Sequence, residues 1–317
     1  MEPVRRKPRL LIAHDLWFGV FSILSLLLFG NYLKVLVQLS IRDDRYSHIL
    51  LIPIISAFLI YLHRNRVFIN PLYCFSKSMP LLVVGIALFY LARTRFSGLN
   101  SNDRLCVVML AVILVWSGGF VLCYGVQSCR AAVFPLLFLL LMVPIPAVAL
   151  DYIILALQKG SAVMTYVLLK LLGVPVLWRH FKFLLPGVEI EIAKECSGIR
   201  SSLALFITSI LTGHLFLRSN WRKVVFSLVT VPVVVFKNAV RIVTISCLGV
   251  YVDPGFLRGT LHRYSGLPFS LVSLVILVPL LFALQRGETC RSDRVEEIDT
   301  RESPASAQTL MQVVERS

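Results

Sequence analysis

The stretch Leu105–Tyr124, LCVVMLAVILVWSGGFVLCY, holds twenty consecutive residues without a single charged side chain. An α-helix of about 20 apolar residues is long enough to cross the roughly 30 Å hydrocarbon core of a bilayer. Apolar runs of similar character recur along the 317-residue chain, which is 57% hydrophobic and 15% charged, with a mean hydropathy of +0.80. This composition is too apolar for a soluble fold and predicts an all-α polytopic integral membrane protein.

About eight transmembrane helices are expected from the apolar runs. They fall near Leu16–Tyr32, His48–Leu62, Met79–Leu91, Leu105–Tyr124, Ala131–Val143, Gly198–Leu217, Val224–Tyr251 and Leu267–Leu284. The first is interpreted as a retained span, because no small-residue cleavage site follows it.

The segment between the fifth and sixth spans has a different pattern. Pro144-Ile145-Pro146 ends a helix, because proline lacks an N–H and restricts the residue before it. Ala147–Leu172 mixes apolar stretches with charged residues, which favours an interfacial helix on the outer face, with a further span as the open alternative. Val174–Ala193 contains Pro186-Gly187 and alternates apolar and polar residues, so a short β-hairpin is expected there.

Basic residues predict the orientation of the spans. The first 9 residues carry Arg5, Arg6, Lys7 and Arg9, and placing them inside puts most later basic clusters inside as well. Arg93, Arg95 and Arg104 then fall outside and weaken the asymmetry without reversing it. We therefore expect an inner (plasma) membrane protein with both termini cytoplasmic, and the segment before the sixth span facing the periplasm or exterior.

The chain divides into two expected regions, a transmembrane domain over 1–285 and a disordered cytoplasmic tail over 286–317. The net charge of +15 lies in short clusters between apolar runs, so the bilayer is the expected partner and nucleic acid is not. The seven cysteines form no CxxC pair and no Cys/His ligand spacing, so neither a disulfide framework, a metal site nor another cofactor is expected.

Cys196 differs from the other cysteines in its surroundings, Glu195-Cys196-Ser197-Gly198-Ile199-Arg200-Ser201-Ser202. It lies at the start of an apolar run, where the unpaired N–H groups and dipole of a helix N-terminus favour a thiolate. Arg200 follows four residues later and so shares a helix face with the thiol. A buried cysteine followed by an arginine reaching the headgroups is an equally good interpretation of this stretch alone.

Two further residues complete a candidate site. Arg241 lies among apolar residues in the outer half of the seventh span, where an ionised side chain is costly and points to function, and Asn238 can line the same face as a substrate-binding residue. His262 precedes the eighth span and is a suitable proton donor and acceptor for a thiol. The orientation places Cys196, Arg241 and His262 at one depth near the outer surface, whereas the other five histidines are interpreted as ordinary interfacial residues.

ECSGIRSS opening one span, NAVRI on the next and LHRYSG before the last together resemble the exosortase/archaeosortase family. The resemblance extends from Ser47-His48-Ile49-Leu50 through Val143-Pro144-Ile145-Pro146 and Leu185-Pro186-Gly187 to the final span. It implies a membrane cysteine protease or transpeptidase that cleaves PEP-CTERM-type sorting signals, each made of a short motif, a transmembrane helix and a basic tail.

The resemblance also implies roles for the site residues. Cys196 would be the nucleophile, His262 the general acid/base and Arg241 the oxyanion stabiliser, while Arg200 would help to bind substrate. No accessory domain is expected after the last span, so any accessory protein would be a separate chain. The alternatives are a secondary transporter built around Arg241, Asn238 and a helix broken near Pro232, and a structural scaffold. The transporter is disfavoured because the polar residues gather at the outer face and no paired repeats are evident.

Overall fold

A computed structural model of the chain describes residues 8–69, 71–95, 98–179, 181–186, 188–192, 198–253, 255 and 269–288. Within these residues, seven helices are long and apolar enough to cross a membrane, or eight if one bent pair forms a single span. The expected all-α polytopic membrane fold is therefore confirmed. Contacts divide the chain into two compact units, Met1–Ile153 and Ile154–Ser317.

The first unit is built from helices alone over its described residues. They are α1 (Pro8–Leu28), α2 (Gly30–Arg42), the 3₁₀ helix η1 (Asp44–Leu50), α3 (Leu51–Leu62), α4 (Arg64–Val67), α5 (Phe75–Thr94), α6 (Ser101–Ala131), α7 (Val133–Phe138) and the 3₁₀ helix η3 (Leu139–Met142). Helix α8 (Ala147–Leu171) begins in this unit and continues into the second.

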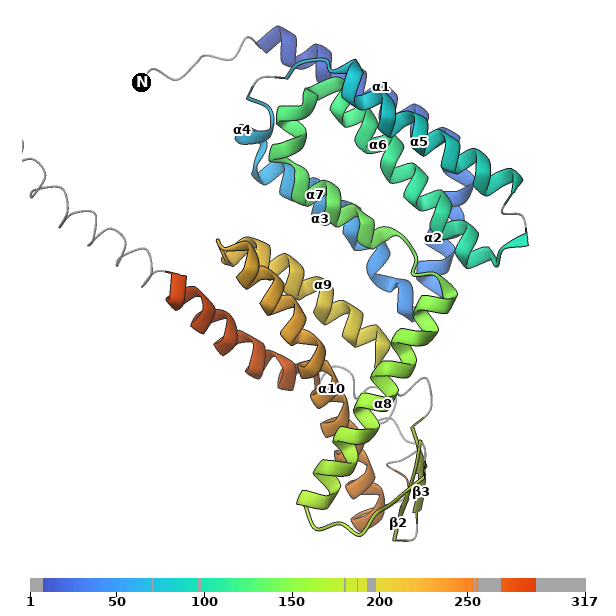
Figure 1. Ribbon diagram of the computed structural model, residues 1–317, viewed down its shortest axis with the longest axis vertical. Helices are drawn as coiled ribbons and strands as arrows, with labels where there is room; N and C mark the ends of the chain where they lie inside the picture. Colours follow the sequence, from blue (N-terminus) through green and yellow to red (C-terminus); the bar gives the residue numbers. More distant parts are fainter. Residues whose placement is uncertain are drawn as a thin grey trace, which may run out of the picture. The chain divides into compact units, whose positions relative to one another are not determined.

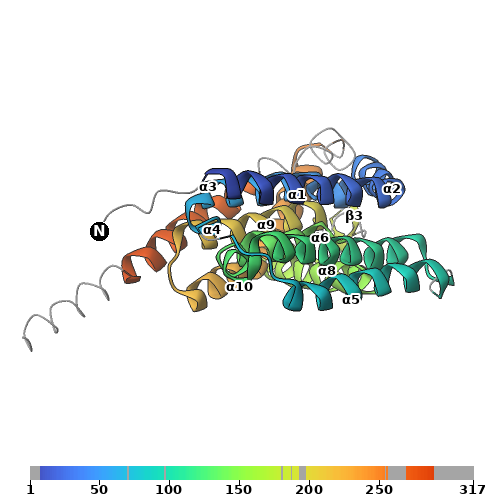
Figure 2. The same ribbon diagram turned by 90° about the horizontal axis from the view of Figure 1, so that it is seen from above.

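Helix α6 is the centre of the first unit. In the most apolar stretch of α6, 61% of the residues are buried, compared with 17% in the corresponding stretch of α5. Helix α5 lies alongside α6 (Figures 1 and 2). Helix α1 packs on α6 through Phe18, whose ring meets Trp116 and Phe120 edge to face. The exposed apolar face of α5, which includes Val83 and Ile86, is what a helix in contact with lipid requires.

The first predicted span, Leu16–Tyr32, is not one straight helix. The structure bends by 72° between Ala13–Leu28 and Gly30–Arg42. Phe29, at the bend, is only 1% exposed and its ring packs edge to face on Phe89 with centroids 4.9 Å apart. Gly30 has a low helix propensity, so buried packing of Phe29 can determine where the helix breaks.

The fifth predicted span, Ala131–Val143, is shorter in the structure than expected. It consists of α7 and η3, which together form an apolar stretch over Val133–Met142. This stretch nevertheless returns the chain to the start of α6, because Asn102 Nδ2 donates to the Ile145 carbonyl at 2.8 Å and the Ala147 N–H donates to Asp103 at 2.7 Å. Helix α8 is itself long and apolar enough to span a membrane, which is the open alternative to an interfacial helix.

The second unit contains β1 (Leu177–Arg179), β2 (Lys182–Leu185), β3 (Val188–Glu191), α9 (Ile199–Phe216), α10 (Asn220–Tyr251) and the helix Phe269–Glu288. The three strands form an antiparallel sheet in the order β1-β2-β3. The predicted hairpin is β2-β3, with Leu185 opposite Val188 on either side of the expected turn. Strand β1, three residues long, was not expected.

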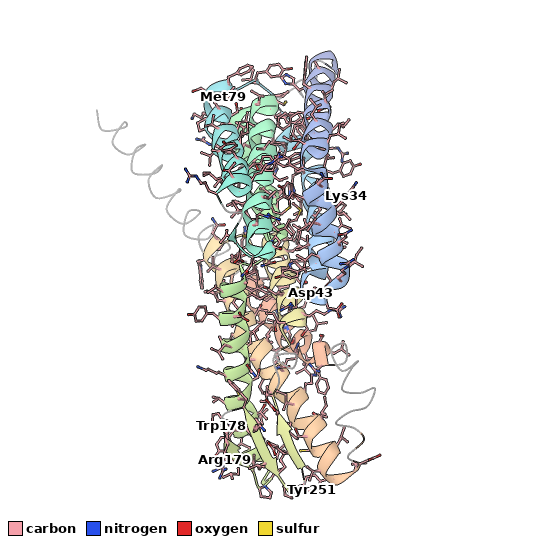
Figure 3. The ribbon with its side chains drawn as sticks, turned by 90° about the vertical axis from the view of Figure 1, so that its right-hand side faces the viewer. Lys34, Asp43, Met79, Trp178, Arg179 and Tyr251 are labelled. Carbon is pink, nitrogen blue, oxygen red and sulfur yellow. The ribbon has the colours of Figure 1, made fainter. Side chains whose placement is uncertain are left out.

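Helix α10 extends well beyond its neighbour α9. Its 32 residues measure about 48 Å, compared with about 27 Å for the 18 residues of α9. Beyond the start of α9, Ile242 and Val243 of α10 join a buried cluster with Ala162 of α8 and Phe183 of β2. Trp178, Arg179 and Tyr251 lie toward the same end of this unit (Figure 3). The start of α9 therefore meets α10 near its middle.

The opposite end of α10 is tied to the helix Phe269–Glu288. The Glu288 carboxylate accepts the backbone N–H groups of Arg218 and Ser219 at 2.9 and 2.8 Å, and Arg222 donates to the Leu284 carbonyl at 2.5 Å. This helix continues to Glu288, four residues beyond the predicted end of the span. Residues 289–317, most of the predicted tail, lie outside the described residues.

Candidate active site

Helix α9 begins one residue after Gly198, at the position expected from the motif that contains Cys196. Gly198 caps the helix with φ 69° and ψ 19°, a left-handed conformation that favours glycine. Its carbonyl accepts the Ser201 hydroxyl at 3.0 Å, the Ser202 hydroxyl at 2.8 Å and the Ser202 N–H at 2.9 Å. The two serines of the motif therefore fix the first turn of α9.

Asn238 fills the space that a side chain at position 198 would occupy. A Cβ atom on Gly198 would lie 3.0 Å from Asn238 Oδ1, so α10 approaches this turn closely. Asn238 is 1% exposed, and its Nδ2 donates to Ser161 Oγ of α8 at 3.0 Å. The small size of Gly198 thus serves the packing of α10 against α9.

Lys237 is a site residue that the sequence analysis missed. It is 2% exposed, and its Nζ donates to Ser201 Oγ at 2.5 Å. Lys237 lies four residues before Arg241, so the two cations share a helix face. That spacing within an apolar helix was the signal in the sequence.

Arg241 and Arg200 come from the two helix turns that meet at this point. Arg241 is half-buried on α10, one helical turn beyond Lys237. Arg200 lies between Gly198 and Ser201 in the first turn of α9 and is exposed. The contact between α9 and α10 therefore brings the first turn of α9, which contains Arg200, to the part of α10 that contains Asn238 and Arg241.

Cys196 and His262 both lie outside the described residues. The described residues on either side of 193–197 are nevertheless held by α8. Gln158 Nε2 donates to the carbonyl of Ile192, and Ser161, three residues further along α8, binds the Asn238 that packs on Gly198. One face of α8 thus supports both chain ends that flank the segment containing Cys196.

Gln158 and Ser161 were not identified as site residues from the sequence. Their signal was a pair of polar residues three apart in an apolar helix, which places them on one face. As for metals, the described part of the chain contains no group of three or more His, Cys, Asp or Glu side chains that could hold an ion.

Comparison with known proteins identifies the family of this sequence. The sequence model of the transmembrane exosortases (Exosortase_EpsH) matches residues 40–279, which is more than half of the chain. The chain belongs to the transmembrane exosortase family. Neither the curated proteins nor the solved structures contain a match to it.

Membership of the exosortase family supports a general role in transpeptidation or protein sorting at the membrane. The matched range includes all the predicted site residues: Cys196, Arg200, Asn238, Arg241 and His262. The multi-pass membrane character expected from the sequence is confirmed by the family and by the apolar helices.

Proposed function

We propose that this exosortase cleaves the C-terminal sorting signals of exported proteins through a thioester on Cys196. The substrates would carry a short motif, a transmembrane helix and a basic tail, of the PEP-CTERM type. Cys196 acts as the nucleophile, Arg241 stabilises the oxyanion and His262 is the general acid/base. Arg200, exposed in the first turn of α9, contacts the substrate.

One observation carries this proposal. The turn that precedes α9 is fixed by Ser201 and Ser202 and braced by Asn238, while Ile192 on the other side is held by Gln158. A nucleophile gains most when its surroundings are rigid, because the reacting atoms then need no further ordering. Asn238 contributes to this bracing, which supports a positioning role for the residue first assigned to substrate binding.

The proposed reaction has two steps. The Cys196 thiolate attacks the carbonyl carbon of the scissile amide, and Arg241 offsets the negative charge that develops on the carbonyl oxygen. The C–N bond then breaks as His262 gives a proton to the leaving amine, and the acyl group remains on sulfur as a thioester. Water or an acceptor amine attacks this thioester, passes its proton to His262, and releases the thiolate.

The depth of the site in the membrane supports an outer-face location. The inner end of α10 carries Trp221, Arg222 and Lys223, and a hydrocarbon core of about 30 Å spans about 20 helical residues from there. Arg241 then lies close to the outer boundary, and the remaining turns of α10 with the β-sheet project beyond it. We therefore place the site at the periplasmic or exterior surface, with both termini cytoplasmic.

Co-expression with a tagged substrate tests the proposal. The substrate carries a short motif, an apolar helix and a basic tail, and its processing is followed as a loss of mass. Cys196→Ala should abolish processing at wild-type expression levels. Cys247→Ala on α10 is the matched control, and it should process normally. Undiminished processing by Cys196→Ala would refute the assigned nucleophile.

A further inference from the structure

Lys237 is a buried cation that the proposed reaction does not use. Among the residues whose side chains the structure describes, Lys237 is the one buried lysine, arginine, aspartate or glutamate, with 2% of its surface exposed. An ammonium carries three donors, and burying it is costly unless the surroundings compensate. The ion pairs in the described part of the chain join Asp43 to Arg45, and Lys182 to the carboxylates of β3, so they do not involve Lys237.

The contacts of Lys237 lead to the turn that precedes α9. Its Nζ donates to Ser201 Oγ at 2.5 Å, and Ser201 Oγ donates to the Gly198 carbonyl at 3.0 Å. Cys196 is two residues before Gly198, and two extended residues span at most about 7 Å. The ammonium therefore adds its charge to the N-terminus of α9, which already carries a partial positive charge from the helix dipole.

We propose that Lys237 is a positioning residue for the cysteine chemistry: it holds the first turn of α9 through Ser201, and its positive charge favours the thiolate of Cys196. This inference rests on the proposed function only in taking Cys196 as the nucleophile. A lysine suits the role because its compact charge can be buried on a flexible stem that reaches across from α10.

The other charged groups on α8, α9, α10 and β3 do not replace the effect of Lys237. Arg241 on α10, Arg200 on α9 and Lys159 on α8 are retained in every variant. The carboxylates of β3 pair with Lys182 instead: its Nζ lies 2.8 Å from Glu189 and 4.0 Å from Glu191. Removing the charge at position 237 therefore leaves the remaining charges unchanged.

The test is the pH dependence of alkylation at Cys196 by an uncharged iodoacetamide, on the full-length protein in detergent. The modified Cys196 peptide is quantified by mass spectrometry in wild type, Lys237→Met, Ser201→Ala and Lys223→Met. Lys223, at the inner end of the same helix, provides the matched control for loss of a lysine.

Lys237→Met should raise the midpoint of alkylation by about one pH unit, the order of magnitude that a unit charge produces over about 10 Å at an effective dielectric constant of about 20. Ser201→Ala keeps the ammonium and should give a smaller rise, and Lys223→Met should give none. A Lys237→Met midpoint equal to that of wild type, in a protein with an unchanged gel-filtration profile, would overturn the inference. If Lys237→Met is not monodisperse, Lys237→Gln replaces it with the same expected shift.

This test is separate from that of the proposed function. If Cys196→Ala still processes substrate, the assigned nucleophile is wrong, whatever the alkylation midpoints show. If Cys196→Ala abolishes processing but the midpoint is independent of Lys237, the function stands and the role of Lys237 does not.

Discussion

The substitution Gly198→Ala tests the geometry of the turn before α9. Gly198 has φ 69°, and an added Cβ atom would lie 3.0 Å from Asn238 Oδ1 and 3.3 Å from its Cγ. Asn238 is held in place by its bond to Ser161 Oγ at 3.0 Å. The new methyl group therefore imposes a backbone cost and also displaces Asn238.

The two costs can be estimated separately. A left-handed conformation costs a non-glycine residue about 1–2 kcal/mol. Displacing Asn238 leaves buried polar groups unpaired, at a cost of about 1–3 kcal/mol. Gly173→Ala is the matched control, because Gly173 has φ 72° but no atom lies within 4 Å of its added Cβ. The free energy of unfolding should thus fall by about 1–3 kcal/mol more at position 198 than at position 173.

Thermal unfolding of the detergent-solubilised variants measures this difference, and substrate processing measures its effect on function. Gly198→Ala should unfold at a lower temperature than Gly173→Ala and should process substrate at least about tenfold more slowly, since a small misplacement of catalytic groups costs that much or more. Adding Asn238→Ser to Gly198→Ala should recover part of the stability, because contacting residues are coupled. Equal unfolding temperatures for the two single alanine variants would refute the proposed packing.

Three further outcomes are expected. Arg241→Lys should lower processing by about a hundredfold or more at unchanged expression, since a point charge does not reproduce the planar guanidinium; near-wild-type turnover would rule out the electrostatic role. Ser161→Ala should lower the free energy of unfolding by about 1–3 kcal/mol, because Asn238 Nδ2 then loses its hydrogen bond to Ser161 Oγ. An unchanged denaturation curve would contradict this. The hydrogen bond from the Arg45 side chain lowers the pKa of Asp43, so this pair stabilises the fold above the ordinary carboxyl pKa and loses that contribution as the pH falls through the lowered value. Asp43→Asn should therefore flatten the decline of the unfolding temperature below about pH 4, by an amount worth no more than about 1 kcal/mol. An unaltered decline would show that the pair is not formed.

The fold could be predicted from the sequence because hydropathy is a local property of the chain. The apolar run Leu105–Tyr124 forms the interior of α6, and Val224–Tyr251 forms most of α10. The break at Phe29 could not be predicted, because it depends on packing against Phe89 from a distant helix. Strand β1 is only three residues long, too short to give a periodic signal.

The candidate site was predicted in part, for a related reason. Arg241 and Asn238 were identified because a polar side chain in an apolar helix is conspicuous in the sequence. Lys237 stands in the same helix, yet its importance comes from contact with Ser201 on another helix. Gln158 lies in Ala147–Leu172, the segment for which an interfacial helix was expected, and its bond to Ile192 depends on how α8 packs against the sheet.

The central claim, a covalent intermediate on Cys196, is tested most directly by trapping it. Full-length protein is mixed with a sorting-signal substrate, quenched in acid and digested, and the Cys196 peptide is examined by mass spectrometry. We predict an added mass equal to the acyl fragment of the substrate, removed by hydroxylamine and absent from Cys196→Ala. Continued processing by Cys196→Ala, or an acyl group on a different residue, would contradict the mechanism.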